Sequence, residues 1–419
     1  MAELGRGSVP ADGRSPGEAG RHAGLPVGDR LGVLVLNQIA ASGLSRLPAE
    51  TYRVGKDVAD PAAILVRSAD LHGIPIAASV RAIGRAGAGT NNIPVKAMSE
   101  RGVPVFNAPG ATANAVKELV LAGMLIAARN IAPAMGFVAG LDGKAPDLDQ
   151  QVEDGKKHFA GYELAGQTLG IIGLGKIGCM VADAAIKLGM NVLGFDPEIT
   201  VDAAWSLPSQ VRRAASVNDV LRNSQFVTLH VPLVDATRHL VNDANIGLMR
   251  PGAVLLNFSR EGVVADSAVL DALEAKRLAQ YVCDFPGAAI HGRAGVIALP
   301  HLGASTREAE ENSAVMVVDQ LRDYLENGNV SNAVNFPAVS MVRESAFRVA
   351  IANANVPNML GQISTAMANA GLNIHNMVNK SRGGMAYTLV DVDSPVTPEV
   401  QAGIAAIQGV LAVRYLPAA

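Results

Sequence analysis

The stretch that decides the fold is Thr168-Leu-Gly-Ile-Ile-Gly-Leu-Gly-Lys-Ile-Gly178, followed by Asn191-Val-Leu-Gly-Phe-Asp196. It predicts a strand, a glycine turn, a helix, a second strand and then an acidic residue. Gly173 permits the sharp turn, Gly175 lets the backbone approach a pyrophosphate, and Gly178 lets the helix pack closely on the sheet. Because the pyrophosphate would lie at the helix N-terminus, the stretch predicts a dinucleotide-binding unit.

The acidic residue at the end of the second strand indicates which dinucleotide is bound. Asp196 comes 18 residues after Gly178, where a carboxylate can accept hydrogen bonds from both hydroxyls of an adenine ribose. The same carboxylate repels a 2′-phosphate, and no arginine follows in 197–200. NAD is therefore favoured over NADP. Lys176 and Ile177, which open the predicted helix, belong to the same predicted cofactor site.

Composition limits the class of protein. The chain has 419 residues, 49% of them hydrophobic and 4% aromatic, with a formal net charge of −3. This favours large aliphatic cores and argues against a nucleic-acid partner. The two cysteines, Cys179 and Cys283, give no disulfide framework and suit a reducing cytoplasm. We expect neither a membrane span nor a signal peptide, and the histidines show no metal-ligand spacing, so no metal is expected.

The pattern of elements predicts an α/β fold with three folded domains. Short apolar strands alternate with helical segments, as doubly wound parallel sheets require. The last 75 residues have the order βαββαβ and are expected to form an independent unit. The expected divisions are a disordered leader at 1–28, a substrate-binding domain at 29–128 plus 306–330, a Rossmann domain for NAD at 129–305, a linker at 331–344 and a C-terminal domain at 345–419, with the polar stretch 142–166 as a connector.

Three polar side chains follow predicted strands of the dinucleotide domain. Arg260 comes after Asn257-Phe-Ser259, Asp284 after Tyr281-Val-Cys283, and His301 after Ala298-Leu-Pro300. The carboxyl ends of parallel strands are where such sheets bind ligands. Oxidation of a secondary alcohol needs a base for the hydroxyl proton and a cation for a neighbouring carboxylate, which histidine and arginine can supply. A structural histidine in a loop and a surface arginine are the alternative.

These segments, with Leu229-His-Val-Pro-Leu233 between them, resemble the D-isomer-specific 2-hydroxyacid dehydrogenase family from Leu31 to Gly328. The resemblance implies an NAD-dependent dehydrogenase in which His301 is the acid/base and Arg260 binds the substrate. It also implies further cofactor contacts from His230, Ser259, Asp284 and Gly303. The motifs Leu65-Val-Arg-Ser68 and Ile83-Gly-Arg-Ala-Gly-Ala-Gly89 resemble family members that act on a phosphorylated acid, with Arg67, Ser68, Arg85 and Gly89 in the substrate site. A purely structural turn around Arg85 is the alternative.

The expected substrate is 3-phospho-D-glycerate, oxidised to 3-phosphohydroxypyruvate in the first step of L-serine synthesis. Two alternatives remain open: a dehydrogenase for an unphosphorylated acid such as lactate or glycerate, and a non-catalytic sensor of NADH or amino acids.

One departure from the family's sequence pattern favours the alternative of a non-catalytic sensor. The glutamate that pairs with the catalytic histidine has no counterpart, because Phe285-Pro-Gly-Ala-Ala-Ile-His-Gly-Arg-Ala294 contains no carboxylate. His301 would then work unassisted, or with help from Asp284 or Glu261.

The C-terminal unit resembles an ACT domain, a small regulatory fold that binds amino acids between paired subunits. The resemblance implies a homodimer or homotetramer and an L-serine site that includes Asn353, Asn355 and Asn373. Pro357 suits the first turn of the helix that follows, and Asn358 stands where the family usually has glycine. A dimerisation sheet without a ligand is the alternative.

Overall fold

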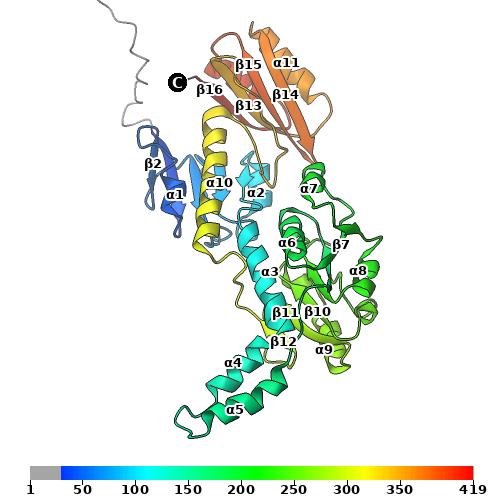
Figure 1. Cartoon of the computed structure of the whole chain (residues 1–419). Coiled ribbons are helices and arrows are strands. Elements are labelled where there is room, and N and C mark those ends of the chain that lie inside the picture. The colour runs from blue at the N-terminus through cyan, green and yellow to red at the C-terminus, as the bar shows by residue number, and fades with distance from the viewer. Residues whose placement is uncertain (1–29, 419) are drawn as a thin grey trace, which may run out of the picture.

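The structure, a computed structural model, describes residues 30–418 and contains three β-sheets (Figure 1). The expected leader at 1–28 lies outside the described residues. Two of the sheets are parallel and have five and seven strands, and the third is antiparallel with four. The predicted α/β class, with two doubly wound sheets and a C-terminal βαββαβ unit, is confirmed.

The first parallel sheet has the order β2-β1-β3-β4-β5. Its central strand β3 is buried throughout, as expected for a strand covered on both faces. Helix α10 packs on this sheet although it lies more than 200 residues later in the chain. The elements are β1 (Leu31–Leu36), α1 (Ala41–Leu44), β2 (Tyr52–Gly55), β3 (Ala63–Val66), β4 (Ala82–Arg85), α2 (Val95–Glu100), β5 (Val105–Phe106) and α10 (Arg307–Asn327).

The second sheet has the order β12-β11-β10-β9-β6-β7-β8 and contains the glycine turn between β6 and α6. The chain order reverses next to β6, so β6 and β9 flank the point where doubly wound sheets bind ligands. Its elements are β6 (Thr168–Ile172), α6 (Lys176–Lys187), β7 (Asn191–Phe195), α7 (Val201–Ser206), β8 (Arg212–Arg213), α8 (Val217–Asn223), β9 (Phe226–Leu229), β10 (Ala253–Asn257), α9 (Asp266–Glu274), β11 (Leu278–Cys283) and β12 (Val296–Ala298), with 3₁₀ turns at Ile246–Leu248 and Glu261–Val263.

Helix α3 (Ala113–Ala128) leads from the first sheet to an arm that projects from the body (Figure 1). The arm contains α4 (Ile131–Ala139), α5 (Leu148–Gly155) and a 3₁₀ turn at Lys156–Phe159. The expected connector at 142–166 thus contains a helix and a 3₁₀ turn before it reaches β6. No single described helix is long and apolar enough to cross a membrane, although α3 and α4 pass that test together across a 68° bend.

The third sheet has the antiparallel order β14-β15-β13-β16. One of its faces packs against its own two helices around Val349, Ile351, Ile363 and Val390. The elements are β13 (Phe347–Ala354), α11 (Met359–Asn369), β14 (Ile374–Arg382), β15 (Met385–Val392), α12 (Pro398–Ala405) and β16 (Val410–Pro417).

The other face of this sheet shares a core with the first sheet. Ala350, Tyr387 and Leu389 belong to the same buried cluster as Val33 of β1 and Tyr324 of α10. The hydroxyl of Tyr387 donates a hydrogen bond to the carbonyl of Gly328, directly after α10. The C-terminal unit therefore packs on the first domain through an apolar interface, which the strand and helix pattern alone did not predict.

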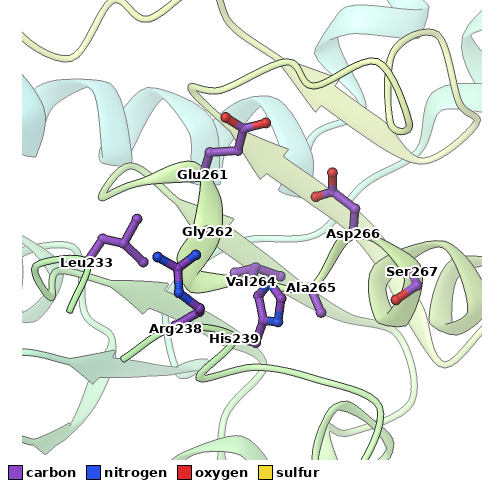
Figure 2. Close-up of a pocket in the computed structure, with 9 residues that line it drawn as sticks. All are labelled: Leu233, Arg238, His239, Glu261, Gly262, Val264, Ala265, Asp266 and Ser267. Carbon is purple, nitrogen blue, oxygen red and sulfur yellow. The ribbon is translucent and has the colours of Figure 1, made fainter. Parts of the chain in front are cut away.

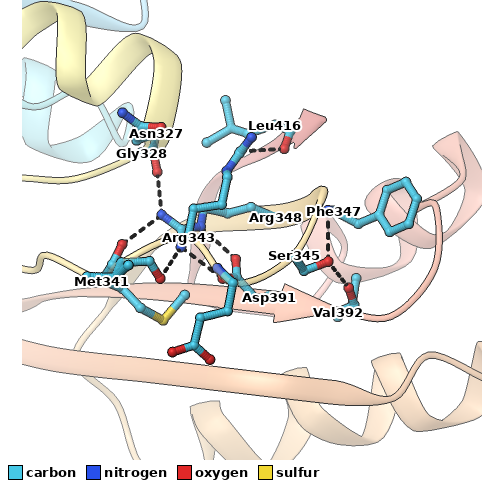
Figure 3. Close-up of polar contacts among 12 residues, drawn as sticks. Asn327, Gly328, Met341, Arg343, Ser345, Phe347, Arg348, Asp391, Val392 and Leu416 are labelled. Carbon is cyan, nitrogen blue, oxygen red and sulfur yellow. Dashed lines mark hydrogen bonds and ion pairs between the residues drawn. The ribbon is translucent and has the colours of Figure 1, made fainter. Parts of the chain in front are cut away.

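A buried ion pair of the C-terminal sheet lies at this interface (Figure 3). Arg348 and Asp391 are both fully buried and are joined by two hydrogen bonds of 2.6 and 2.9 Å. The remaining donors of Arg348 reach the carbonyls of Asn327 at 3.1 Å, Met341 at 2.9 Å and Val342 at 2.9 Å. One side chain thus joins the C-terminal sheet, the end of α10 and the segment between them.

Candidate active site

The glycine turn has the geometry that a dinucleotide needs. Gly173 adopts φ +94°, and a Cβ there would collide with the carbonyl oxygen of His230. A Cβ on Gly178 would collide with the carbonyl of Gly173, so the helix can approach the turn only without a side chain. Gly175 differs, because a Cβ there would meet nothing within 4 Å. The open space at the N-terminus of α6 fits a pyrophosphate.

Asp196 follows β7 beside this turn and is already hydrogen-bonded to the backbone. Its Oδ2 accepts from the amide of Leu174 at 2.8 Å, and its Oδ1 accepts from the amide of Glu198 at 2.9 Å. Each carboxylate oxygen has two lone pairs, so both can still accept from a ribose hydroxyl. The two backbone contacts orient the carboxylate next to the turn.

His230 lies at the end of β9, behind Gly173. Burial lowers its pKa to about 4, so the ring is neutral near pH 7. Its Nε2 is 3.1 Å from the hydroxyl of the buried Thr228, while its Nδ1 is buried without a hydrogen-bond partner. A neutral ring with both nitrogens enclosed suits packing beside the glycine turn better than proton transfer.

Arginines from the two parallel sheets converge at Gly89, since Arg85 ends β4 and Arg260 comes three residues after β10. Terminal nitrogens of Arg85 and Arg260 each lie 3.7 Å from the position that a Cβ on Gly89 would occupy. Burial and the charges of Arg260 and Arg67 lower the pKa of Arg85, but an arginine remains charged. Among the described residues, neither Arg85 nor Arg260 forms an ion pair with a carboxylate. Two guanidinium groups that have no carboxylate partner among the described residues could together hold an anion.

Arg67 differs from its neighbours because it has a partner. Its Nη2 lies 2.7 Å from Oε1 of Glu310 in α10, and its carbonyl accepts from Nε of Arg85 at 3.2 Å. Ser68 is exposed next to it, and the Ser68 amide donates to Oδ1 of Asn37 at 3.1 Å. The structure therefore brings Arg67, Arg85 and Arg260 together and adds Glu310, which the sequence pattern did not single out.

His301 lies in a strained and exposed loop. It adopts φ +56°, and its ring packs on Phe285 with a centroid distance of 4.9 Å. Within residues 30–418, no carboxylate forms an ion pair or hydrogen bond with this ring. The buried Asp284 instead accepts from the amides of Leu302 and Gly303, each at 2.7 Å, and so holds the loop from the other side.

Glu261 lines a pocket of about 560 Å³ next to the turn that carries Arg260 (Figure 2). It lies near Asp266 on one side of the pocket, with Arg238 and His239 on the other. Burial, followed by the charge of Glu261, raises the pKa of Asp266, while His239 lowers it. The described contacts do not join Glu261 to His301, so in this structure neither it nor Asp284 replaces the missing family glutamate at the histidine ring. Among the described residues, no cluster of His, Cys, Asp and Glu is arranged to hold a metal ion.

The asparagines expected in the effector site lie at two ends of the C-terminal sheet. Asn353 pairs with Ala386 of β15, whereas Asn373 precedes Ile374, which pairs with Val392. Six residues of strand separate these rows, which is about 20 Å at the usual rise per residue. A single chain therefore cannot bring the asparagines together, and a site that uses all three needs a second copy.

The loop before α11 differs from the expected cap. The helix begins at Met359, so Pro357 precedes the N-cap rather than occupying the first turn as expected. Asn358 is the N-cap with φ +63°, a left-handed conformation that asparagine tolerates better than most residues. Its side-chain oxygen lies over Gly361 in the first turn. Asn355 is held to the β14–β15 turn, since its Nδ2 donates to the carbonyl of Gly383 at 3.1 Å.

Comparison with known proteins agrees with this geometry. Residues 124–303 match the family model described as "D-isomer specific 2-hydroxyacid dehydrogenase, NAD binding domain". The chain is 33% identical over 351 residues to the D-3-phosphoglycerate dehydrogenase of Escherichia coli strain K12, covering 80% of this chain and 81% of the relative. It is 36% identical over 269 residues to the enzyme of that name from Methanocaldococcus jannaschii, covering 63% of this chain but only 49% of the relative.

Solved structures show the same architecture. An NAD⁺-bound 3-phosphoglycerate dehydrogenase of Entamoeba histolytica superposes with a TM-score of 0.56 and 23% identity, over 73% of this chain and 98% of that one. A D-2-hydroxyisocaproate dehydrogenase superposes with a TM-score of 0.59 and 22% identity, over 73% and 100%. At these identities the likeness supports the fold alone. The sequence relatives and the family model carry the further conclusion that this chain belongs to the NAD-dependent, D-isomer specific 2-hydroxyacid dehydrogenases.

Proposed function

We propose that the protein oxidises 3-phospho-D-glycerate to 3-phosphohydroxypyruvate with NAD, the first step of L-serine synthesis. The observation that carries this proposal is the pair of unpaired guanidinium groups of Arg85 and Arg260 at Gly89. A substrate with a carboxylate at one end and a phosphate at the other offers an anion to each. The sequence relatives named for this reaction support the same substrate.

The proposed roles follow from the chemistry of each side chain. Arg260 binds the carboxylate and polarises the oxygen at C2, because its planar fork can form two parallel hydrogen bonds. His301 takes the hydroxyl proton while hydride leaves C2 for the nicotinamide ring. Arg85 binds the phosphate, with Arg67, Ser68 and Gly89 at the same end. Because the substrate phosphate would compete with Glu310 for Arg67, binding is expected to open that ion pair.

The cofactor would occupy the cleft at the glycine turn. Gly173, Gly175 and Gly178 leave room for the pyrophosphate, with Lys176 and Ile177 beside it, and Asp196 faces the adenine ribose. His230 and Ser259 would also contact the bound cofactor. Asp284 and Gly303, joined by a hydrogen bond, would lie at the nicotinamide end.

One assay separates this proposal from its alternatives. NADH absorbance is followed with phosphohydroxypyruvate, pyruvate and hydroxypyruvate as oxidants. The proposal requires kcat/KM to be highest for phosphohydroxypyruvate by at least about 100-fold, or about 2.7 kcal/mol. Equal rates with the unphosphorylated acids would indicate a lactate- or glycerate-type enzyme. NADH binding without turnover of any of the three would indicate a sensor, which the absence of a carboxylate at His301 favours.

We further propose that the protein is a homodimer or homotetramer. The exposed side of α4 supports this, because Met135 and Val138 are 68% and 57% exposed in an apolar groove of about 650 Å³. A second copy would cover this surface. L-serine is proposed as an effector at a second interface, where Asn353 and Asn355 of one copy meet Asn373 of another. The free, buried cysteines accord with a proposed cytoplasmic location.

Analytical ultracentrifugation tests the oligomer, and calorimetry on the full chain tests serine. No serine heat and no effect on turnover would leave the C-terminal domain as an assembly element. The full chain is needed because the C-terminal sheet shares its core with the first domain.

A further inference from the structure

Asn257 is the last residue of β10 and is fully buried. It pairs with Leu229 of β9 on one side and with Cys283 of β11 on the other, so it lies in the middle of the sheet at its carboxyl edge. The turn that carries Arg260 begins three residues earlier, at Asn257 itself. A polar side chain at this depth needs partners, and the partners that it has identify what it does.

Both the oxygen and the nitrogen of the Asn257 side-chain amide form hydrogen bonds. Its Oδ1 accepts from the amide of Ser259 at 3.1 Å and from the Ser259 hydroxyl at 2.9 Å. Its Nδ2 donates to the carbonyl of Arg260 at 2.9 Å and to the hydroxyl of Tyr281 at 3.3 Å. Because a backbone N–H must donate and a backbone carbonyl must accept, these contacts determine the orientation of the amide.

The Ser259–Arg260 turn also holds the guanidinium group of Arg260. Nη1 of Arg260 donates to the carbonyl of Ser259 at 2.6 Å, so the position of that carbonyl directs the arginine fork. Burial raises the pKa of Tyr281, which keeps its hydroxyl protonated beneath the turn. Thus Asn257 and Tyr281 are a buried support, and Arg260 is the exposed group that they support.

We propose that Asn257 is a positioning residue for the reaction: it fixes the Ser259–Arg260 turn so that the Arg260 fork meets the substrate carboxylate in the reactive orientation. The inference rests on the proposed role of Arg260. A displacement of about 1 Å in a group that orients substrate can reduce the rate by about 100-fold. An asparagine that only stabilised the fold would not act through one arginine.

The test compares Asn257→Ala with a matched asparagine in the same domain. Asn245 also accepts from one backbone amide, that of Asn242, and donates to one backbone carbonyl, that of Leu240, and among the described hydrogen bonds its side chain makes none to Ser259 or Arg260. Both variants are measured for thermal midpoint, NADH binding, kcat, and KM for phosphohydroxypyruvate. We expect Asn257→Ala to reduce kcat/KM by about 10- to 100-fold with unchanged NADH binding, and Asn245→Ala to change kcat/KM by less than about twofold.

A double-variant cycle with Arg260→Lys then separates a positioning role from a structural one. If Asn257 acts through Arg260, adding Asn257→Ala to Arg260→Lys should cost less than about threefold, because the oriented fork is already gone. A full and multiplicative loss, or equal losses for the Asn257 and Asn245 variants, would overturn the inference. Where Asn257→Ala does not fold, Asn257→Ser is used in the same cycle and judged by the same outcomes. If Arg260→Lys alone keeps full activity, the proposed role of Arg260 is wrong, which is a distinct result.

Discussion

Oδ2 of Asp284 accepts a hydrogen bond of 2.7 Å from the backbone amide of Gly303. The other oxygen of this carboxylate accepts from Leu302 at the same distance. The contacts join the end of β11 to the residues directly after His301, so the loop with the proposed acid/base is held by its neighbours and not through its ring. These two hydrogen bonds can therefore hold the His301 loop in place without a glutamate at the ring.

Replacing Asp284 with Asn should therefore disturb the histidine loop. An amide offers one oxygen where two backbone amides need acceptors, and a buried unsatisfied donor costs about 1–3 kcal/mol. We expect a lower thermal midpoint and a fall in kcat that exceeds the change in NADH affinity. The control is Asp219→Asn, because Asp219 of α8 also accepts from a backbone amide, that of Ala215, but has no hydrogen bond to the histidine loop among the described residues. Equal kinetic effects of the two changes would mean that Asp284 has no link to the histidine loop.

His301→Ala should reduce turnover by about 10²–10⁴-fold, the usual contribution of a general acid/base. NADH affinity, followed by the fluorescence of bound NADH, should change little, because the ring packs on Phe285 and lies outside the glycine turn. Phe285→Leu serves as a partner variant, since it removes the ring contact but keeps the histidine. Near-normal turnover in His301→Ala would remove His301 from the proposed mechanism.

Arg85→Ala should raise KM for phosphohydroxypyruvate far more than KM for hydroxypyruvate, because only the former brings a phosphate to this guanidinium. Loss of a charge-assisted contact of this kind costs about 1.5–3 kcal/mol, or roughly 10- to 100-fold. Arg101 is the matched structural arginine, as it donates to the carbonyls of Ile76 and Ala77 in the same domain. Equal losses on both substrates in Arg85→Ala would identify a structural arginine instead.

Asp196→Ser should lower the preference for NAD over NADP by about tenfold or more, corresponding to about 1.4 kcal/mol. The change removes both the ribose contact and the repulsion of a 2′-phosphate. It also removes an acceptor of the Leu174 amide, so some loss of activity with both cofactors is expected. Glu198→Ser, two residues further along the chain, is the control, because it also removes one negative charge near the turn. Wild-type protein that used both cofactors equally would contradict the proposed role of Asp196.

Local pattern predicted the elements of this protein well, because strands and helices are encoded by neighbouring residues. The predicted order βαββαβ is the order of the C-terminal unit, and the predicted strand, glycine turn, helix and strand over 168–196 are β6, the turn at Gly173, α6 and β7. The arm was not predicted. Helix α4 contains Pro133 and Gly136, which weaken a helical pattern, and it has no buried residue to create an apolar stripe.

Contacts between distant residues could not be predicted in the same way. Glu310 looks like an ordinary acid in the first turn of a helix, and only the fold brings it to Arg67. The core shared by β1, α10 and the C-terminal sheet has the same origin, since small apolar residues such as Ala350 and Ala352 carry no signal about which element they face. The sequence identified Asn257 only as part of the motif Asn257-Phe-Ser259. Its hydrogen bonds to Ser259 and Arg260 form only once the chain has turned, so the sequence pattern did not predict them.

The Arg348–Asp391 pair makes the stability of the protein depend on pH in the acid range. Burial alone would raise the pKa of Asp391, but hydrogen bonds from Arg348 and from the Glu344 amide, with the charge of Arg348, lower it overall from 3.8. A pKa that is lower in the folded state adds stability above the unfolded value, and this stability is lost as pH falls through the folded value. Stability should therefore decline below about pH 3.8, and Asp391→Asn should weaken that part of the decline.

Breaking the pair should affect more than the C-terminal domain. Arg348→Ala leaves a buried carboxylate without its cation, a change that typically costs about 3–5 kcal/mol, and it removes the hydrogen bonds to Asn327 and Met341 that close the end of α10. Since the first domain and the C-terminal sheet share one core, calorimetry of the wild type should show them unfolding in a single transition, and the variant should shift that whole transition down. Arg46→Ala, which breaks the exposed pair with Asp319 on the same helix, should shift it by little, because exposed pairs contribute about 0–1 kcal/mol. Separate transitions in the wild type, with only one of them moved by Arg348→Ala, would show instead that the C-terminal unit is energetically independent.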